Sequence, residues 1–175
     1  MKRLAIAAAL AVALPAVADD GAPFRATLTG YHEVPSVSSK ADGEFQARVS
    51  ADGNSVDYTL AWDGLQADVL MSHIHFAQKS VNGPIIVWLC GTTAQPGPAG
   101  TQTCPGRSGV IKGTFTSADV LASPATQQLA AGDLAALIAG MRAGSAYVNI
   151  HSTVSPGGEM RGQITARGSS DSDKQ

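Results

Sequence analysis

Charged residues are scarce in this chain of 175 residues: Asp, Glu, Lys and Arg make up 15% of it, against about 25% in ordinary soluble domains. The formal net charge is −2, and Lys and Arg form no cluster, which argues against a nucleic-acid-binding role. The hydrophobic fraction of 44% argues against wholesale disorder, since disordered chains are poor in apolar residues. The length suits one domain that is large enough to bury a core.

Catalytic motifs are also missing. No serine stands in a Gly-x-Ser-x-Gly elbow, and the carboxylates form no paired motif. A Gly-rich phosphate loop of the required spacing is absent as well. These absences leave the four histidines as the main candidates for chemistry.

Only the first residues form a long apolar run. Lys2 and Arg3 precede an unbroken apolar stretch from Leu4 to Leu14, and small residues occupy the −3 and −1 positions of a cleavage site after Ala18. This pattern is typical of a secretory signal peptide. A retained membrane anchor is disfavoured, because a spanning helix needs about 20 apolar residues and no later run is that long.

Cleavage after Ala18 defines the working protein that the sequence predicts. Losing two of the twelve basic residues leaves ten, against fourteen acidic residues, and hence a net charge of −4. We expect an exported protein, periplasmic or secreted, with a single domain over residues 19–167. The small polar residues 168–175 are expected to form a disordered tail.

Two cysteines, Cys90 and Cys104, enclose a loop rich in Gly, Pro, Thr and Gln. In an oxidising compartment we expect this pair to form a structural disulfide. Closing a loop of this size stabilises a fold by roughly 3 kcal/mol on the chain-entropy model. A zinc site is the weaker alternative, because two thiols alone at this spacing match no common zinc pattern.

Apolar and polar residues alternate in short runs from Phe24 onward, and turn residues separate the runs. Alternation of this kind indicates β-strands with one face in the core. Eight such runs predict a mainly β fold, an antiparallel Greek-key-like sandwich or barrel. The predicted strands begin near Phe24, Phe45 and Val56 and continue with Val69–Phe76, Ile85–Cys90, Val110–Phe115, Ala146–His151 and Glu159–Thr165.

One stretch, near residues 133–142, has helical instead of strand spacing. Its apolar residues recur at i, i+3, i+4 and i+7, namely Leu134, Leu137, Ile138 and Met141. Asp133 is suited to begin the helix and Gly144 to end it. We expect this short helix to pack its apolar stripe against the sheet. A shorter helical turn is predicted over Ser117–Leu121.

Three histidines share a strand face if alternation holds in Val69–Phe76 and Ala146–His151. In the first run Leu70, Ile74 and Phe76 are predicted to point into the core, so Met71, His73 and His75 point outward. In the second run the same sorting places Tyr147, Asn149 and His151 outward. If the two strands are neighbours, His73, His75 and His151 form one patch on the outer surface.

Such a patch can bind a metal ion, since a His-x-His pair on a strand places both rings on one side, about 7 Å apart at Cα. Neutral nitrogen ligands with few carboxylates suit copper, with zinc as the alternative. Met71 is a candidate soft ligand that would favour Cu(I), and His32 is a candidate fourth ligand if its loop folds over the patch. Exposed histidines without a metal remain the alternative interpretation.

Three groups of segments together form a recognisable pattern: Leu28–Gly30 with Glu33–Pro35, His73–His75 with Asn82–Ile85, and Tyr147–His151 with Pro156–Gln163. In these segments the chain resembles the CHRD domain, the module first described in chordin, and the resemblance extends over about Phe24 to Ala166. It implies a secreted β-sandwich domain, and most bacterial members have no assigned activity.

A fainter likeness is to Cu/Zn superoxide dismutase, in which a strand-borne His-x-His and a later strand-end His bind copper. His73, His75 and His151 match that order, and Arg161 matches an arginine that guides the anion. No stretch resembles the bridging histidine or the zinc-binding loop of that family.

Three functions are therefore open. The favoured one is a non-enzymatic exported module that holds copper. The second is a copper enzyme acting on superoxide, and the third is an interaction domain for another extracytoplasmic protein, in which the histidines are structural.

Overall fold

The computed structural model describes residues 23–166. The expected signal peptide, residues 1–18, and the expected polar tail, residues 168–175, both lie outside this range. No helix in the described range is long and apolar enough to cross a membrane.

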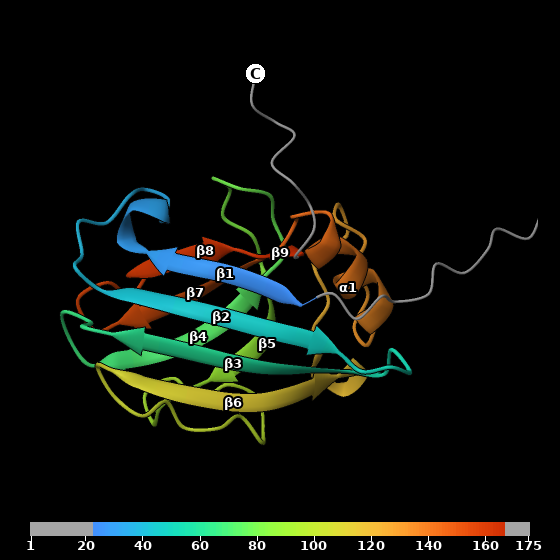
Figure 1. Cartoon of the computed structure of the whole chain (residues 1–175), viewed down its shortest axis with the longest axis horizontal. Coiled ribbons are helices and arrows are strands. Elements are labelled where there is room, and N and C mark those ends of the chain that lie inside the picture. The colour runs from blue at the N-terminus through green and yellow to red at the C-terminus, as the bar shows by residue number, and fades with distance from the viewer. Residues whose placement is uncertain (1–22, 167–175) are drawn as a thin grey trace, which may run out of the picture.

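The described residues form a mainly antiparallel β structure with one α-helix (Figure 1). Eight strands make a sheet in the order β5-β4-β7-β8-β1-β2-β3-β6, with the short β9 paired to β1, and the sheet is nearly closed into a barrel. The predicted fold class is thereby confirmed. The strands are β1 Phe24–Thr29, β2 Asp42–Val49, β3 Ser55–Asp63, β4 Val69–His75, β5 Ile85–Cys90, β6 Gly109–Thr116, β7 Tyr147–Ser152, β8 Met160–Gln163 and β9 Thr165–Ala166.

Two layers are visible in Figure 1, with β1, β2, β3 and β6 in front and the remaining long strands behind. Several pairings join strands that are distant in the sequence: β3 pairs with β6, β4 with β7, and β1 with β8. The run predicted as one strand over Glu159–Thr165 is divided into β8 and β9, because the buried Ile164 between them turns its backbone N–H to Ala146.

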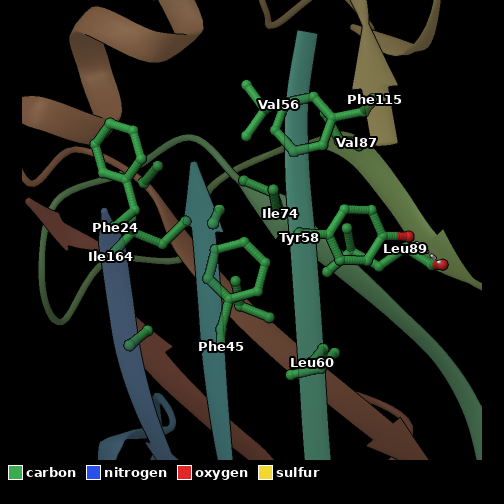
Figure 2. Packing of buried hydrophobic residues seen from close by; sticks show 14 of the residues in the cluster. Phe24, Phe45, Val56, Tyr58, Leu60, Ile74, Val87, Leu89, Phe115 and Ile164 are labelled. Carbon is green, nitrogen blue, oxygen red and sulfur yellow. Dashed lines mark hydrogen bonds between the residues drawn. The ribbon is translucent and has the colours of Figure 1, made fainter. Parts of the chain in front are cut away.

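The core fills the space between the two layers (Figure 2). Alternate residues of β3, which are Val56, Tyr58, Leu60 and Trp62, are all buried, as their spacing predicted. Phe45 stacks on Tyr58 with ring centroids 6.2 Å apart. Ile74 of β4 is fully buried in this core, whereas Phe76 is only partly buried against it.

The placement of Leu70 in the core was wrong, because this residue is half-buried and lies outside the core cluster. The pairing of β4 with β7 is irregular between Val69 and Met71, and this irregularity interrupts the strict alternation of faces on which the prediction depended.

The predicted helix is α1, Leu134–Arg142. Asp133 accepts a hydrogen bond from the backbone N–H of Ala136 at 2.9 Å, which is N-terminal capping. Leu137 and Met141 are fully buried, so the helix packs as expected. The turn predicted after β6 is a short 3-10 helix, η2, over Ser117–Asp119, and another, η1, spans Gly30–His32.

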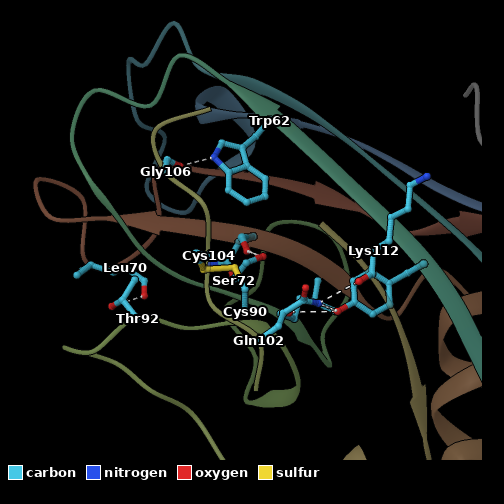
Figure 3. The surroundings of a disulfide bond; sticks show 12 residues. Trp62, Leu70, Ser72, Cys90, Thr92, Gln102, Cys104, Gly106 and Lys112 are labelled. Carbon is cyan, nitrogen blue, oxygen red and sulfur yellow. Dashed lines mark hydrogen bonds between the residues drawn. A yellow bond between two sulfur atoms is a disulfide. The ribbon is translucent and has the colours of Figure 1, made fainter. Parts of the chain in front are cut away.

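The predicted disulfide between Cys90 and Cys104 is present and buried (Figure 3). It closes a loop whose ends also pair through their backbones, with Cys104 N–H donating to the Gly91 carbonyl at 2.8 Å. The hydroxyl of Thr92 donates to the carbonyl of Leu70 at 3.0 Å. The loop is thus fastened to β4, the strand that carries the His-x-His pair.

Candidate metal centre

The pairing of β4 with β7 brings three histidines together. In this ladder Met71 lies opposite His151, and His73 lies opposite Asn149. One ligand nitrogen from each of His73, His75 and His151 lies within 4.8 Å of the other two. The sequence alone could not show whether the strands that carry these histidines are neighbours; in the structure they are.

The prediction that this cluster lies on the outer surface was wrong. His73, His75 and His151 are 0%, 7% and 6% exposed. The histidines do share a face, but loops cover that face: the Pro156 carbonyl contacts His151, and the Gly83 carbonyl contacts His75. Every residue of β7 is buried, so both faces of this strand are covered.

Two backbone carbonyls decide which nitrogen carries the proton in two of the rings. Gly83 O lies 2.9 Å from His75 Nδ1, and Pro156 O lies 3.0 Å from His151 Nδ1. A carbonyl oxygen only accepts, so each Nδ1 donates and, in a neutral ring, each Nε2 keeps a lone pair. Metal-binding histidines are commonly oriented in this way by an acceptor on the opposite ring nitrogen.

Unpartnered polar atoms gather at this cluster. Within residues 23–166 four buried side-chain N or O atoms have no hydrogen-bond partner: both ring nitrogens of His73, Nε2 of His151 and Oε1 of Glu33. Leaving such an atom unpaired costs about 1–3 kcal/mol, and most buried polar groups are therefore paired. The unused lone pairs of His73 and His151 are what a bound metal ion would engage.

The electrostatics keep these rings neutral, which is the state that binds a metal. Burial, followed by the neighbouring rings of His151 and His75, lowers the pKa of His73 to about 2. Burial likewise lowers the pKa of His151 to about 4, although the contact with Pro156 opposes the shift. The pKa of His75 is lowered mainly by burial.

Aromatic rings hold the cluster in place. The indole of Trp88 lies edge-on to His73, with ring centroids 4.2 Å apart. Tyr147 stacks on His75 at 4.7 Å with an angle of 1° between the ring planes. These contacts restrict the ring rotations that a loosely held ligand set would undergo.

Arg161, expected to guide an anion, is 2% exposed and extensively bonded. Its Nε donates to the His32 carbonyl at 2.8 Å, and its Nη1 donates to Asn82 Oδ1 at 3.0 Å. The guanidinium also lies 4.4 Å from the centroid of the Tyr147 ring. It therefore fastens the loops that carry His32 and Asn82 over the face that bears the histidines.

The two further ligand candidates are placed differently. His32 is exposed at the end of η1, contributes its backbone carbonyl to Arg161, and is not in the three-histidine group. Met71 is half-buried directly across the ladder from His151, on the strand face where alternation predicted it.

Sequence reasoning gave no role to two buried carboxyl groups. Glu33 follows η1, and burial raises its pKa to about 7, although the nearby Arg161 opposes the shift. Glu159 is fully buried and accepts hydrogen bonds from Ser39 Oγ at 2.7 Å, from Gln66 N–H at 2.8 Å and from Ser152 Oγ. Both residues lie in the motifs that carry the CHRD resemblance, which was the only sequence signal for them.

A metal fits this donor set. Tetrahedral bonds of about 2.0–2.1 Å to nitrogen place ligand atoms roughly 3.3 Å apart. Nitrogens within 4.8 Å of one another are somewhat wider apart than that spacing, so a bound ion would draw the three rings closer together. Three neutral imidazoles without a carboxylate suit copper or zinc and not calcium or magnesium.

A family model described as the CHRD domain matches residues 24–164, nearly all of the described range. The chain belongs to the CHRD domain family. No curated protein and no solved structure gives a match. CHRD membership and the buried disulfide between Cys90 and Cys104 are both consistent with an extracellular setting.

Proposed function

We propose that this CHRD protein is an exported, non-enzymatic module that holds one copper ion on His73, His75 and His151, with zinc as the alternative metal. The observation that carries the proposal is the gathering of unpartnered buried ring nitrogens at one point of the fold. Buried nitrogen atoms without partners cost stability, and a bound cation offsets that cost.

Copper is favoured over zinc by the general order of affinities for nitrogen ligands. No Asp, Glu or Cys belongs to the metal-ligating group found in residues 23–166. The group therefore lacks the carboxylate oxygens that hard cations such as calcium and magnesium prefer. Met71 adds a soft sulfur on the strand opposite His151, which supports copper further.

A binding role is favoured over a catalytic one because the cluster is covered. Each of the three rings is at most 7% exposed. Arg161, the residue that a superoxide enzyme would use to guide its anion, is occupied by the His32 and Val81 carbonyls and by Asn82. Storage or sequestration needs only slow exchange of the ion through the covering loops.

Export is proposed on the leader sequence of residues 1–18 and on the disulfide. The positive start, apolar run and small residues before the cleavage site form a secretory signal. The disulfide between Cys90 and Cys104 fits an oxidising compartment.

The test is the copper content of protein recovered from an oxidising compartment and freed of loose metal by dialysis. We expect about one copper per chain, and loss of that copper when His73, His75 and His151 are all replaced by Phe, which keeps the rings' packing. The matched control is His32→Ala, which removes the exposed histidine and leaves copper content unchanged.

Either of two results overturns the proposal: wild-type protein without copper or zinc, or a folded triple variant with undiminished metal. The interaction-domain hypothesis, with structural histidines, would then stand. Bound copper together with rapid superoxide turnover would instead support the enzyme hypothesis.

A further inference from the structure

Asn149 occupies the centre of the buried histidine face. It lies in β7 opposite His73 of β4 on one side and opposite Arg161 of β8 on the other. Tyr147 and His151, two residues away on the same strand, share its face. Asn149 is 3% exposed, so its carboxamide lies among the candidate ligands and is sealed from solvent.

The carboxamide of Asn149 faces the nitrogen that His75 would offer to a metal. Asn149 Oδ1 lies 3.0 Å from His75 Nε2. The Nδ1 of His75 donates to the Gly83 carbonyl, so in a neutral ring Nε2 has only a lone pair to present to that oxygen. Two acceptors at this distance repel each other, and a half-turn of the carboxamide replaces the oxygen by an NH2 group that can donate.

Glu33 supplies the second partner of this carboxamide. A hydrogen bond with the Asn149 side chain is one of the influences that lower the pKa of Glu33 against the larger effect of burial. Glu33 Oε1 is buried without a partner, and it lies against Gly158, where a Cβ would come within 2.5 Å of it. The NH2 group of Asn149 therefore has two acceptors to choose from, the Nε2 of His75 and the carboxyl of Glu33.

We propose that Asn149 is a positioning residue that gates the metal site by turning its carboxamide. In the metal-free protein its NH2 group donates to His75 Nε2 and caps that lone pair. When a metal ion takes the lone pair, the carboxamide would swing away from Nε2 towards Glu33, because the atom that now lies 3.0 Å from that nitrogen would occupy the place of the metal. This inference rests on the proposed function, because it describes how the same three-histidine site is opened and closed.

If Asn149 gates the site, replacing it should change the metal affinity in the opposite direction from that expected for a purely structural asparagine. A capping hydrogen bond competes with the metal for His75, so removing the donor raises metal affinity. A buried hydrogen bond of ordinary net strength corresponds to about a fivefold change in a binding constant. A structural asparagine would instead lower the affinity when replaced, because the rings would lose their support.

The experiment compares wild type with Asn149→Leu and Asn149→Ala. Neither side chain can donate to the lone pair or bind a metal, and the smaller alanine serves if the leucine variant fails to fold. The matched control is Ser72→Ala, which removes the 2.7 Å hydrogen bond from Ser72 Oγ to the Asn149 backbone carbonyl and leaves the carboxamide untouched. The ligand is Cu(I), added without oxygen and measured by competition with a chelator of known affinity.

Imidazole ¹⁵N NMR of the metal-free proteins supplies the second readout. We expect wild-type His75 in the Nδ1–H form, with the Nε2 signal displaced by an accepted hydrogen bond. That displacement disappears in both Asn149 variants and persists in Ser72→Ala. We expect Cu(I) to bind the Asn149 variants about fivefold more tightly than wild type, with little change for the control.

The inference is overturned if wild-type His75 carries its proton on Nε2, or on both nitrogens. It is also overturned if the folded Asn149 variants bind Cu(I) more weakly than wild type. The proposed function fails in a different way, namely by the absence of Cu(I) binding in wild type itself, and the gate falls with it.

Discussion

Acid should weaken the metal-free fold through its buried histidines. In the unfolded chain a histidine takes up a proton below a pKa of about 6.5. In the folded protein the pKa of His73 is about 2 and that of His151 about 4, mainly because of burial. Between pH 6.5 and those values only the unfolded state binds the proton, so stability is present above pH 6.5 and is lost as the pH falls.

The magnitude follows from about 1.4 kcal/mol per pH unit for each such group. Between pH 7 and pH 5 each of these two histidines lowers the free energy of unfolding by about 2 kcal/mol. His75, whose pKa is also lowered by burial, adds to this loss. Glu33 acts in the opposite direction, because burial raises its pKa from 4.5 to about 7. As the pH falls, the Glu33 carboxyl takes up its proton in the folded state before it does so in the unfolded state. This raises the free energy of unfolding by about 2 kcal/mol between pH 7 and pH 5.

The assay is urea unfolding of metal-free protein at pH 7 and pH 5. From pH 7 to pH 5 we expect the free energy of unfolding of wild type to fall by about 2 kcal/mol or more. That of Glu33→Gln, which cannot take up the compensating proton, should fall by about 4 kcal/mol or more. His73→Phe should reduce the loss by about 2 kcal/mol. If Glu33→Gln were as stable at pH 5 as at pH 7, the assignment of neutral, buried histidines would be refuted.

Two further predictions concern the surroundings of the site. In a Trp62→Phe background, Cu(II) should quench the remaining indole fluorescence, because Trp88 lies 4.2 Å from the ring of His73; an unquenched signal on stoichiometric binding would place the metal elsewhere. Replacing Cys90 and Cys104 by serine should lower the free energy of unfolding by roughly 3 kcal/mol, measured by urea denaturation, and a change under 1 kcal/mol would contradict a stabilising clamp.

Local patterns predicted the fold class and the composition of the cluster, because both depend on a two-residue period. Alternation placed His73 and His75 on one face of β4 and His151 on one face of β7, and the ladder joins those faces. The helix was equally predictable, since the spacing from Leu134 to Met141 and the cap at Asp133 are local.

Burial of the cluster was not predictable in this way. An alternating strand shows which side a residue takes but not what covers that side. The cover comes from the Gly83 and Pro156 carbonyls, whose loops fold over that face, and from Trp88, which lies opposite His73 in the ladder of β4 with β5. Alternation within β4 and β7 predicts neither the loops nor this pairing. For the same reason the buried carboxyl of Glu33 carried no local signal, because its environment is made by Arg161 and Gly158.

The most direct test of the central claim is the X-ray absorption spectrum of the copper-loaded protein, with the zinc-loaded protein measured alongside. We expect three imidazole nitrogens at about 2.0 Å from the metal, and we expect one of them to be lost from the spectrum when His151 is replaced by Phe. A first shell made of oxygen, or a shell unchanged in the His151→Phe variant, would contradict that claim.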